Sequence, residues 1–121
     1  SVIYAYDKAP LNTVEMSDST LQAVKEGMHN LTTGSLSYYF SNCVVSAGAK
    51  TGTAETGIAN TNNGVFVCFA PYDDPQIAVA VVIEKGGSGA ALASTAVDIV
   101  NSYFSQEEIG AVVIGENTLL K

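Results

Sequence analysis

The sequence of 121 residues contains few of the residue types that bind nucleic acids or metals. Its five basic residues are all lysines and lie apart, whereas twelve acidic residues bring the net charge to -7. A nucleic-acid-binding face needs grouped basic side chains, so we expect no nucleic-acid partner. His29 is the only histidine, and the two cysteines lack metal-ligand spacing, so we expect neither a metal site nor a cofactor.

Long apolar runs are also missing. No stretch approaches the roughly 18 apolar residues of a membrane-spanning helix, so we expect no span within this segment. No signal-peptide pattern is found either, because Ser1 leads directly into a strand-like segment at residues 2–6. This abrupt start predicts that the chain begins within a domain. With 47% hydrophobic and 14% charged residues, the composition is that of a globular core.

The first half of the chain predicts one amphipathic helix. A cluster of helix-starting residues at 17–20 precedes it, with Ser19 and Gln22 as the expected capping-box pair. The helix should end near residues 32–34, and a short helical turn should follow at 35–40. One face of the long helix carries the apolar side chains Leu21, Val24, Met28 and Leu31.

The second half of the chain predicts a sheet and a helix. Two nearly continuous apolar runs, 65–70 and 77–83, are joined by a short polar connection and should form an antiparallel hairpin. Their continuous apolarity predicts that both faces of the sheet are covered. The other expected elements are a strand at 47–56, a loop at 57–64, a helix at 90–104 and a short strand at 111–114. The predicted fold class is α/β of the α+β type, an antiparallel sheet flanked by helices.

The chemically most informative segment is the strand at 47–56. It contains Lys50, Thr51, Gly52 and Thr53, which combine one cation, two hydroxyl groups and an uncluttered backbone. These groups can bind a carboxylate and can present backbone N–H groups to an acyl carbonyl. The three letters KTG alone are weak evidence, but their place before a strand–strand–helix pattern strengthens the interpretation.

Three stretches together resemble the transpeptidase domain of penicillin-binding proteins, and most closely the class B, high-molecular-mass type. Residues 24–28 (VKEGM) are similar to the family's V-x-x-G-M helix, and residues 66–71 (FVCFAP) are similar to its F-V-G-Y-A-P strand. Residues 47–55 (AGAKTGTAE) resemble AGKTGTAE, with Ala49 as the extra residue. The resemblance covers about residues 2–104. It implies that residues 1–121 are the C-terminal portion of a serine β-lactamase/D,D-transpeptidase-like fold, with 105–121 as a tail.

The resemblance also implies roles for the strand residues. Lys50 would place its ammonium group beside the serine of another motif, and the Thr51 and Thr53 hydroxyls would bind a substrate carboxylate. Gly52 would leave room for the substrate, and the backbone N–H of Thr53 would form half of the oxyanion hole. The family's Ser-x-x-Lys and Ser-x-Asn motifs are absent from these 121 residues. The segment therefore lacks the nucleophile, and we expect it to be inactive in isolation.

The expected ligands are peptidoglycan stem peptides ending in D-Ala-D-Ala, and β-lactams. The expected partner is the N-terminal half of the same domain, with a homo-oligomer of the segment as another arrangement. The parent protein would act at the extracytoplasmic face of a bacterial membrane. A β-lactam-binding sensor, a serine β-lactamase and a mere folding or assembly unit remain alternatives.

The remaining polar residues carry structural expectations. Glu55 should be structural, His29 should be a surface or cap residue, and the acidic pair at 73–74 should lie at a hairpin tip. The glycine-rich loop at 86–89 should only turn the chain into the last helix. Cys68 lies in an apolar run and should be buried, and a bridge between Cys43 and Cys68 is left open.

Overall fold

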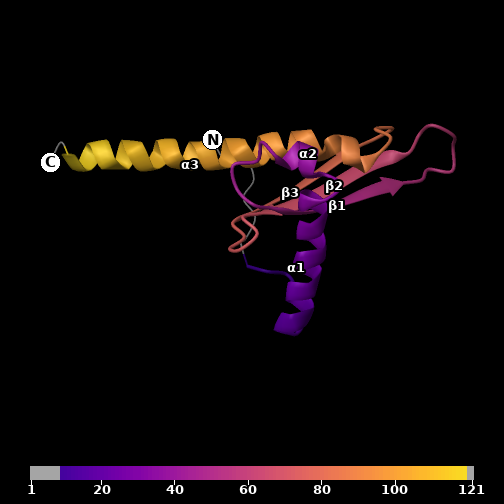
Figure 1. Ribbon diagram of the computed structural model, residues 1–121, viewed down its shortest axis with the longest axis horizontal. Helices are drawn as coiled ribbons and strands as arrows, with labels where there is room; N and C mark the ends of the chain where they lie inside the picture. Colours follow the sequence, from indigo (N-terminus) through magenta and orange to yellow (C-terminus); the bar gives the residue numbers. More distant parts are fainter. Residues whose placement is uncertain (1–8, 120–121) are drawn as a thin grey trace.

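The computed structural model describes the backbone of residues 9–119 and the side chains of residues 9–106. Three helices, a three-stranded sheet and one 3-10 turn make up an α+β fold, which confirms the predicted class (Figure 1). The strand expected at 2–6 lies outside the described residues. In chain order the elements are α1 (Asp18–Thr33), α2 (Ser37–Phe40), β1 (Gly48–Ala54), β2 (Asn63–Ala70), β3 (Ile77–Ile83), η1 (Gly89–Leu92) and α3 (Ala93–Leu119).

The sheet is antiparallel with strand order β1-β2-β3, so β2 is central. Val67 of β2 pairs with Lys50 of β1 on one side and with Ala80 of β3 on the other. The predicted hairpin is therefore confirmed. The expected strand at 47–56 is confirmed as β1, one to two residues shorter at each end.

One face of the sheet packs against α3 and η1 and forms the core. Phe66 and Ala70 of β2 are fully buried there, and the small side chains Ala93 and Ala96 let α3 approach the sheet closely. Phe66 also stacks on Phe40 of α2, with ring centroids 6.3 Å apart. The other members of this core are Leu36, Ala47, Ala49, Cys68, Val79, Leu92 and Val100.

The opposite face of the sheet is only partly covered by the described residues. The C-terminal part of α1 lies on β1, while the rest of the helix extends away from the sheet (Figure 1). As a result Leu21 is 47% exposed and Val24 54% exposed. Val82 of β3 is 64% exposed. The expectation that both faces are covered is therefore wrong for this part of the chain, because α1 covers only one corner of the second face.

The start of α1 differs from the expected capping box. Ser17 is the N-cap residue, and its hydroxyl oxygen accepts a hydrogen bond from the Thr20 N–H at 3.2 Å. Gln22 instead donates to Glu26 at 3.2 Å and to the Tyr72 hydroxyl at 3.1 Å. The pairing of Ser19 with Gln22 is thus wrong, because the helix starts two residues earlier. Its predicted end is confirmed at Gly34, whose N–H donates to the Asn30 carbonyl.

The last helix is longer than the sequence pattern predicted. α3 runs without interruption to Leu119, so the short strand expected at 111–114 is wrong. No proline interrupts this stretch, and a short apolar run is equally compatible with a helix. Among the described residues, no helix combines the length and apolarity needed to cross a membrane.

Both cysteines are free thiols, and Cys68 is only 3% exposed, which confirms its predicted burial. Burial raises the pKa of Cys43, although a hydrogen bond from the Val45 backbone opposes the shift. Burial, with a smaller contribution from Cys43, raises the pKa of Cys68 to about 11. Since only the thiolate is nucleophilic, the two thiols should differ in reactivity.

We expect iodoacetamide at pH 8 to alkylate Cys43 well before Cys68, because about one Cys68 thiol in 10³ is ionised at that pH. The native state holds the Cys68 proton more tightly than the unfolded chain does. The protonated Cys68 thiol therefore contributes to the free energy of unfolding below the ordinary thiol pKa, and this contribution is lost as the pH rises toward 11. Peptide mass spectrometry after timed labelling measures both rates. Equal rates in the folded protein would contradict the burial, and urea should abolish any difference.

Candidate active site

The KTG motif lies on a strand at the edge of the sheet. β1 pairs only with β2 among the described residues, so its other edge has no strand partner there. An edge strand presents a row of backbone N–H and C=O groups that can pair with an added segment. The question for any site on this strand is therefore which residues direct their backbone groups outward.

Gly52 directs its backbone groups inward, toward β2. A Cβ atom added to Gly89 would lie 2.3 Å from the Gly52 carbonyl oxygen and 2.4 Å from that of Val65, its direct partner. The two oxygens can be this close together only if they face each other, as in a hydrogen-bonded antiparallel pair. Neighbouring residues of a strand point their backbone groups the opposite way. Thr51 and Thr53 therefore direct their N–H and C=O groups to the outer edge.

The Lys50 ammonium group lies at the same edge. Its Nζ donates to the Thr51 carbonyl oxygen at 2.8 Å, and the side chain is exposed. This contact agrees with an outward-facing Thr51 carbonyl. A cation and an outward-facing N–H of Thr53 thus border one unpaired edge, which is an arrangement suited to a carboxylate or a developing oxyanion.

The two threonine side chains lie on the α3 side of the sheet. Thr51 pairs directly with Phe66, and paired residues share a face, whereas Lys50 is on the opposite face. The Thr53 hydroxyl accepts a hydrogen bond from the Gly89 N–H at 3.5 Å. A hydroxyl that accepts one hydrogen bond still has a hydrogen to donate, so this position is compatible with further binding.

The glycine-rich loop does more than turn the chain. Gly89 sits directly behind the motif, so close to Gly52 and Val65 that no side chain fits between them. Sequence reasoning missed this role, although four residues of glycine and serine just before a helix are a signal for close backbone packing. The loop also has a residue that needs glycine, since Gly87 has a φ of 73°.

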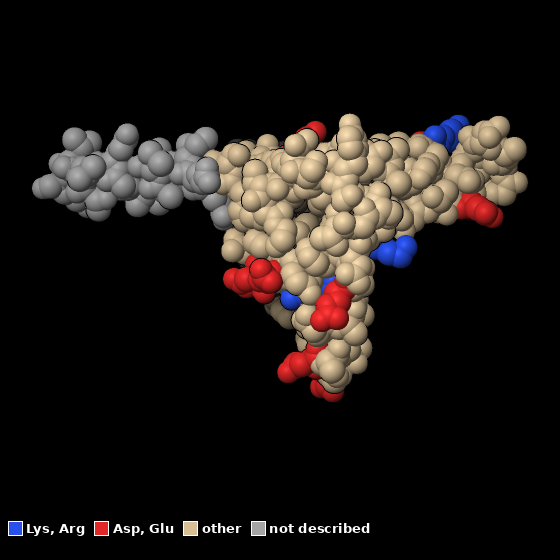
Figure 2. All heavy atoms as spheres, in the orientation of Figure 1, with Lys and Arg blue, Asp and Glu red and all other residues tan. Residues whose placement is uncertain are grey.

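The other polar residues lie apart from the motif. Glu55 is exposed just after β1, and Asp73 and Asp74 are exposed in the turn between β2 and β3. Within the described residues, no cluster of three or more His, Cys, Asp or Glu side chains could bind a metal ion. On the face shown in Figure 2, the basic side chains are few and separate, while acidic ones gather along the projecting part that contains α1.

His29 is not the surface or cap residue that the sequence predicted. It is half-buried, and its ring stacks on Tyr72 with centroids 4.2 Å apart. Its Nδ1 lies 2.9 Å from the Ala47 carbonyl oxygen. The expectation failed because the spacing of residues within a helix carries no signal for partners in later segments, such as Ala47 and Tyr72.

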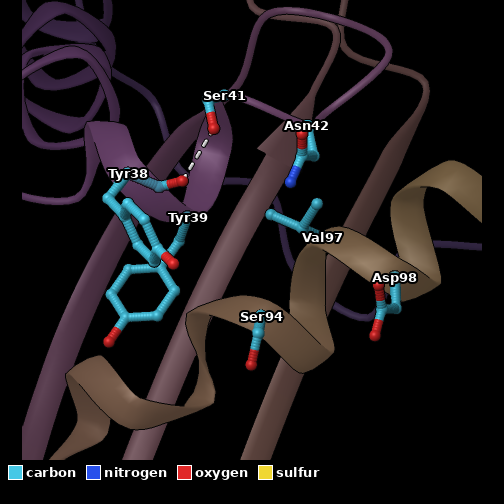
Figure 3. Close-up of a pocket in the computed structure, with 7 residues that line it drawn as sticks. All are labelled: Tyr38, Tyr39, Ser41, Asn42, Ser94, Val97 and Asp98. Carbon is cyan, nitrogen blue, oxygen red and sulfur yellow. Dashed lines mark hydrogen bonds between the residues drawn. The ribbon is translucent and has the colours of Figure 1, made fainter.

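A separate hollow of about 270 Å³ lies between α2 and α3 (Figure 3). Tyr38 and Tyr39 border it with their rings edge to face, and the Ser41 hydroxyl donates to the Tyr38 carbonyl at 2.8 Å. None of its lining residues belongs to the motif. Its remaining lining residues are Asn42, Ser94, Val97 and Asp98.

A family model described as the penicillin binding protein transpeptidase domain matches residues 1–103. The chain belongs to the penicillin-binding protein transpeptidase family. This confirms the resemblance predicted from the helix, KTG and strand motifs.

Among the relatives, penicillin-binding protein 2B of Streptococcus pneumoniae serotype 2 (strain D39) is 38% identical over 109 residues, which cover 77% of this chain and 15% of the relative. The peptidoglycan D,D-transpeptidase MrdA of Escherichia coli (strain K12) is 31% identical over 88 residues, covering 59% and 14%. The solved structure of penicillin-binding protein 2B from Streptococcus pneumoniae (strain R6) matches with a TM-score of 0.70 and 32% identity, covering 87% and 19%. These relatives are class B penicillin-binding proteins, as predicted. The chain spans about 15% of the length of the curated relatives.

We expect a Gly89→Ala substitution in this penicillin-binding protein segment to lower the free energy of unfolding by about 1–3 kcal/mol, because the methyl group would overlap the backbone of the KTG strand. Gly27→Ala is a matched control on the exposed face of α1, where nothing lies within 4 Å of the added Cβ. It should raise the free energy of unfolding by about 0.5–1 kcal/mol through helix propensity. Urea denaturation measures both. Similar effects for the two variants would show that Gly89 is not closely packed.

Proposed function

We propose that this chain is the C-terminal portion of the transpeptidase domain of a peptidoglycan D,D-transpeptidase, and that it supplies one wall of the active site. The observation that carries the proposal is the KTG motif on an unpaired strand edge, with the Lys50 ammonium group and the Thr51 and Thr53 backbone groups at that edge. Membership in the family and the named transpeptidase relative agree with this activity.

In this proposal the stem peptide ending in D-Ala-D-Ala lies along β1 as an added strand. The outward N–H and C=O groups of Thr51 and Thr53 pair with its backbone, and Gly52 leaves space beside the strand. The Lys50 ammonium group attracts the terminal carboxylate, and the Thr51 and Thr53 hydroxyls donate hydrogen bonds to it. A β-lactam carries a carboxylate at a comparable place and would bind in the same way.

The chemical step is acyl transfer through a serine ester. A serine hydroxyl attacks the carbonyl of the D-Ala-D-Ala bond, terminal D-Ala leaves, and an amine then takes the acyl group from the serine. The Thr53 N–H stabilises the oxyanion in both tetrahedral intermediates. Since the 121 residues contain no Ser-x-x-Lys or Ser-x-Asn motif, the serine and its activating groups come from another part of the parent protein.

The partly bare face of the sheet is the proposed contact with the N-terminal half of the domain. Val67 and Val82 are exposed on this face, and Leu21 and Val24 are exposed on α1 beside it. An apolar hollow of about 270 Å³ opens between Met28, Phe69 and Ala80. Exposed apolar side chains in this number favour coverage by another segment. A homo-oligomer that buries the same face is the competing arrangement.

The site of action follows from the substrate. Peptidoglycan is cross-linked outside the cytoplasmic membrane, so we place the parent protein at the extracytoplasmic face of a bacterial membrane. A β-lactam sensor would use the same wall for recognition alone, and a serine β-lactamase would hydrolyse the acyl group quickly. The lifetime of the acyl-enzyme therefore separates these functions.

We expect a fluorescent penicillin to label the full-length protein stoichiometrically and to leave the 121-residue chain unlabelled, because the chain lacks the nucleophile. Gel fluorescence and intact-protein mass measure the adduct. A slow loss of the label identifies a transpeptidase or sensor, whereas rapid turnover identifies a β-lactamase. Stoichiometric acylation of the 121-residue chain would show that it does contain a nucleophile, and would contradict the prediction.

We expect Thr53→Pro in the full-length protein to lower the acylation rate by about 10²–10³, since it removes one oxyanion donor. Proline is tolerated where an edge strand directs its N–H outward, so the sheet should survive the change. Thr53→Val is the matched control, because it removes the hydroxyl group and keeps the N–H. Stopped-flow acylation measures the rate. An equal loss in both variants would assign the effect to the side chain rather than to the backbone.

A further inference from the structure

The carbonyl group of Ala47, just before β1, receives hydrogen bonds from two side chains of α1. The Thr32 hydroxyl donates to it at 2.7 Å, and His29 Nδ1 lies 2.9 Å from the same oxygen. A carbonyl oxygen can only accept, so Nδ1 must carry the hydrogen. Two donors from one helix thus converge on one backbone atom three residues before Lys50.

The hydrogen bond between the Thr32 hydroxyl and the Ala47 carbonyl joins two buried residues. Thr32 is 4% exposed and Ala47 2% exposed, so the loss of the Thr32 hydroxyl would remove a hydrogen bond that water cannot readily replace. The Thr32 hydroxyl also lies 2.9 Å from the His29 carbonyl oxygen, but it has only one hydrogen. The shorter distance favours Ala47, and the Thr33 hydroxyl donates to the His29 carbonyl at 3.0 Å.

The His29 ring is held in place from the other side by Tyr72. The two rings stack, and the Lys25 ammonium group lies 5.4 Å from the centroid of the Tyr72 ring. The Gln22 amide donates to the Tyr72 hydroxyl, and the Tyr72 N–H donates to the Ser46 carbonyl at 2.9 Å. Residues 46 and 47 are therefore held both by α1 and by the turn after β2.

The start of β1 is also fixed by close packing. A Cβ atom added to Gly48 would lie 3.1 Å from the Met28 Cβ and 2.6 Å from the Phe69 ring, so helix and strand are in direct contact here. Lys50 lies two residues after Gly48, only about 7 Å further along the strand. Because β1 has one strand neighbour among the described residues, its position depends on contacts of this kind.

We propose that His29 and Thr32 are positioning residues, which set the place of the KTG strand through their shared hydrogen bonds to the Ala47 carbonyl. This inference rests on the proposed function. They touch neither the substrate nor the reacting atoms. Their effect is to hold Lys50 and the Thr53 N–H where the acyl carbonyl and its carboxylate arrive.

The test uses paired substitutions in the full-length protein. Thr32→Val keeps the shape and removes the hydroxyl, whereas Thr32→Ser keeps the hydroxyl. His29→Phe keeps the stacking on Tyr72 and removes Nδ1, whereas His29→Asn places an amide N–H near the position of Nδ1. Acylation by a fluorescent penicillin gives a rate constant and an amplitude for each variant, and the amplitude reports the folded fraction.

We expect Thr32→Val and His29→Phe each to lower the acylation rate constant about tenfold, since small displacements of catalytic groups have large kinetic effects. Thr32→Ser and His29→Asn should stay within about twofold of the wild type. Thr32→Val combined with His29→Phe should lose less than the product of the single effects, because both act on one oxygen. Val100→Ala, a buried change on α3, should lower the thermal midpoint and the amplitude but not the rate constant.

Wild-type rate constants in Thr32→Val and His29→Phe would overturn the inference, as would a rate loss in Val100→Ala of equal size. Failure of the wild type to label would instead disprove the proposed function. Hydrogen exchange then still tests the hydrogen bonds themselves. Peptides from residues 48–54 should exchange about tenfold faster in Thr32→Val than in Val100→Ala, and unchanged exchange would overturn the positioning role.

Discussion

The burial of Phe66 against α2 and α3 decides which way every residue of the sheet points. Side chains of a strand alternate between the two faces of the sheet. A shift of one residue in β2 would therefore move Phe66 and the other buried side chains of the strand to the less covered face. With this register fixed, Thr51 must share a face with Phe66 and Lys50 must lie on the other. Packing on the α3 side therefore determines where the polar groups of the KTG motif appear, although none of them belongs to the core.

The two faces of the sheet differ in how well the described residues cover them. Small residues at the start of α3 allow a close approach on the core side, whereas only the end of α1 reaches the opposite side. Strands as apolar as β2 and β3 favour coverage on both faces. The prediction that both faces are covered is wrong for the described residues, because, of the three strands, α1 packs chiefly on β1, at one corner of the second face.

The sequence predicted those elements of the fold that leave a local signal, such as an apolar run or a turn residue. The strands β2 and β3 and the end of α1 follow from apolar runs and flanking turn residues, and they were placed within one or two residues. The start of α1 was misplaced because Ser17 and Ser19 both fit a capping pattern, and only the backbone path selects between them. The candidate site was proposed from the order of the motif residues alone, whereas Gly89 and His29 contact β1 and the residue before it. Such contacts leave no mark at the level of spacing.

These two missed residues support opposite ends of the same strand. Gly89 packs behind Gly52, and its N–H donates a hydrogen bond to the Thr53 hydroxyl. His29 donates to the carbonyl of Ala47, the residue just before the strand. Between the two supports, Lys50 and the outward backbone groups of Thr51 and Thr53 line an edge without a strand partner among the described residues. The proposed oxyanion stabilisation by the Thr53 N–H depends on a donor that is already in place when charge develops, since a donor that must first be ordered loses much of its effect. An edge strand can meet that requirement only if it is held from outside its own hydrogen-bond ladder. The helix α1 and the glycine-rich loop provide that hold from two separate places in the chain.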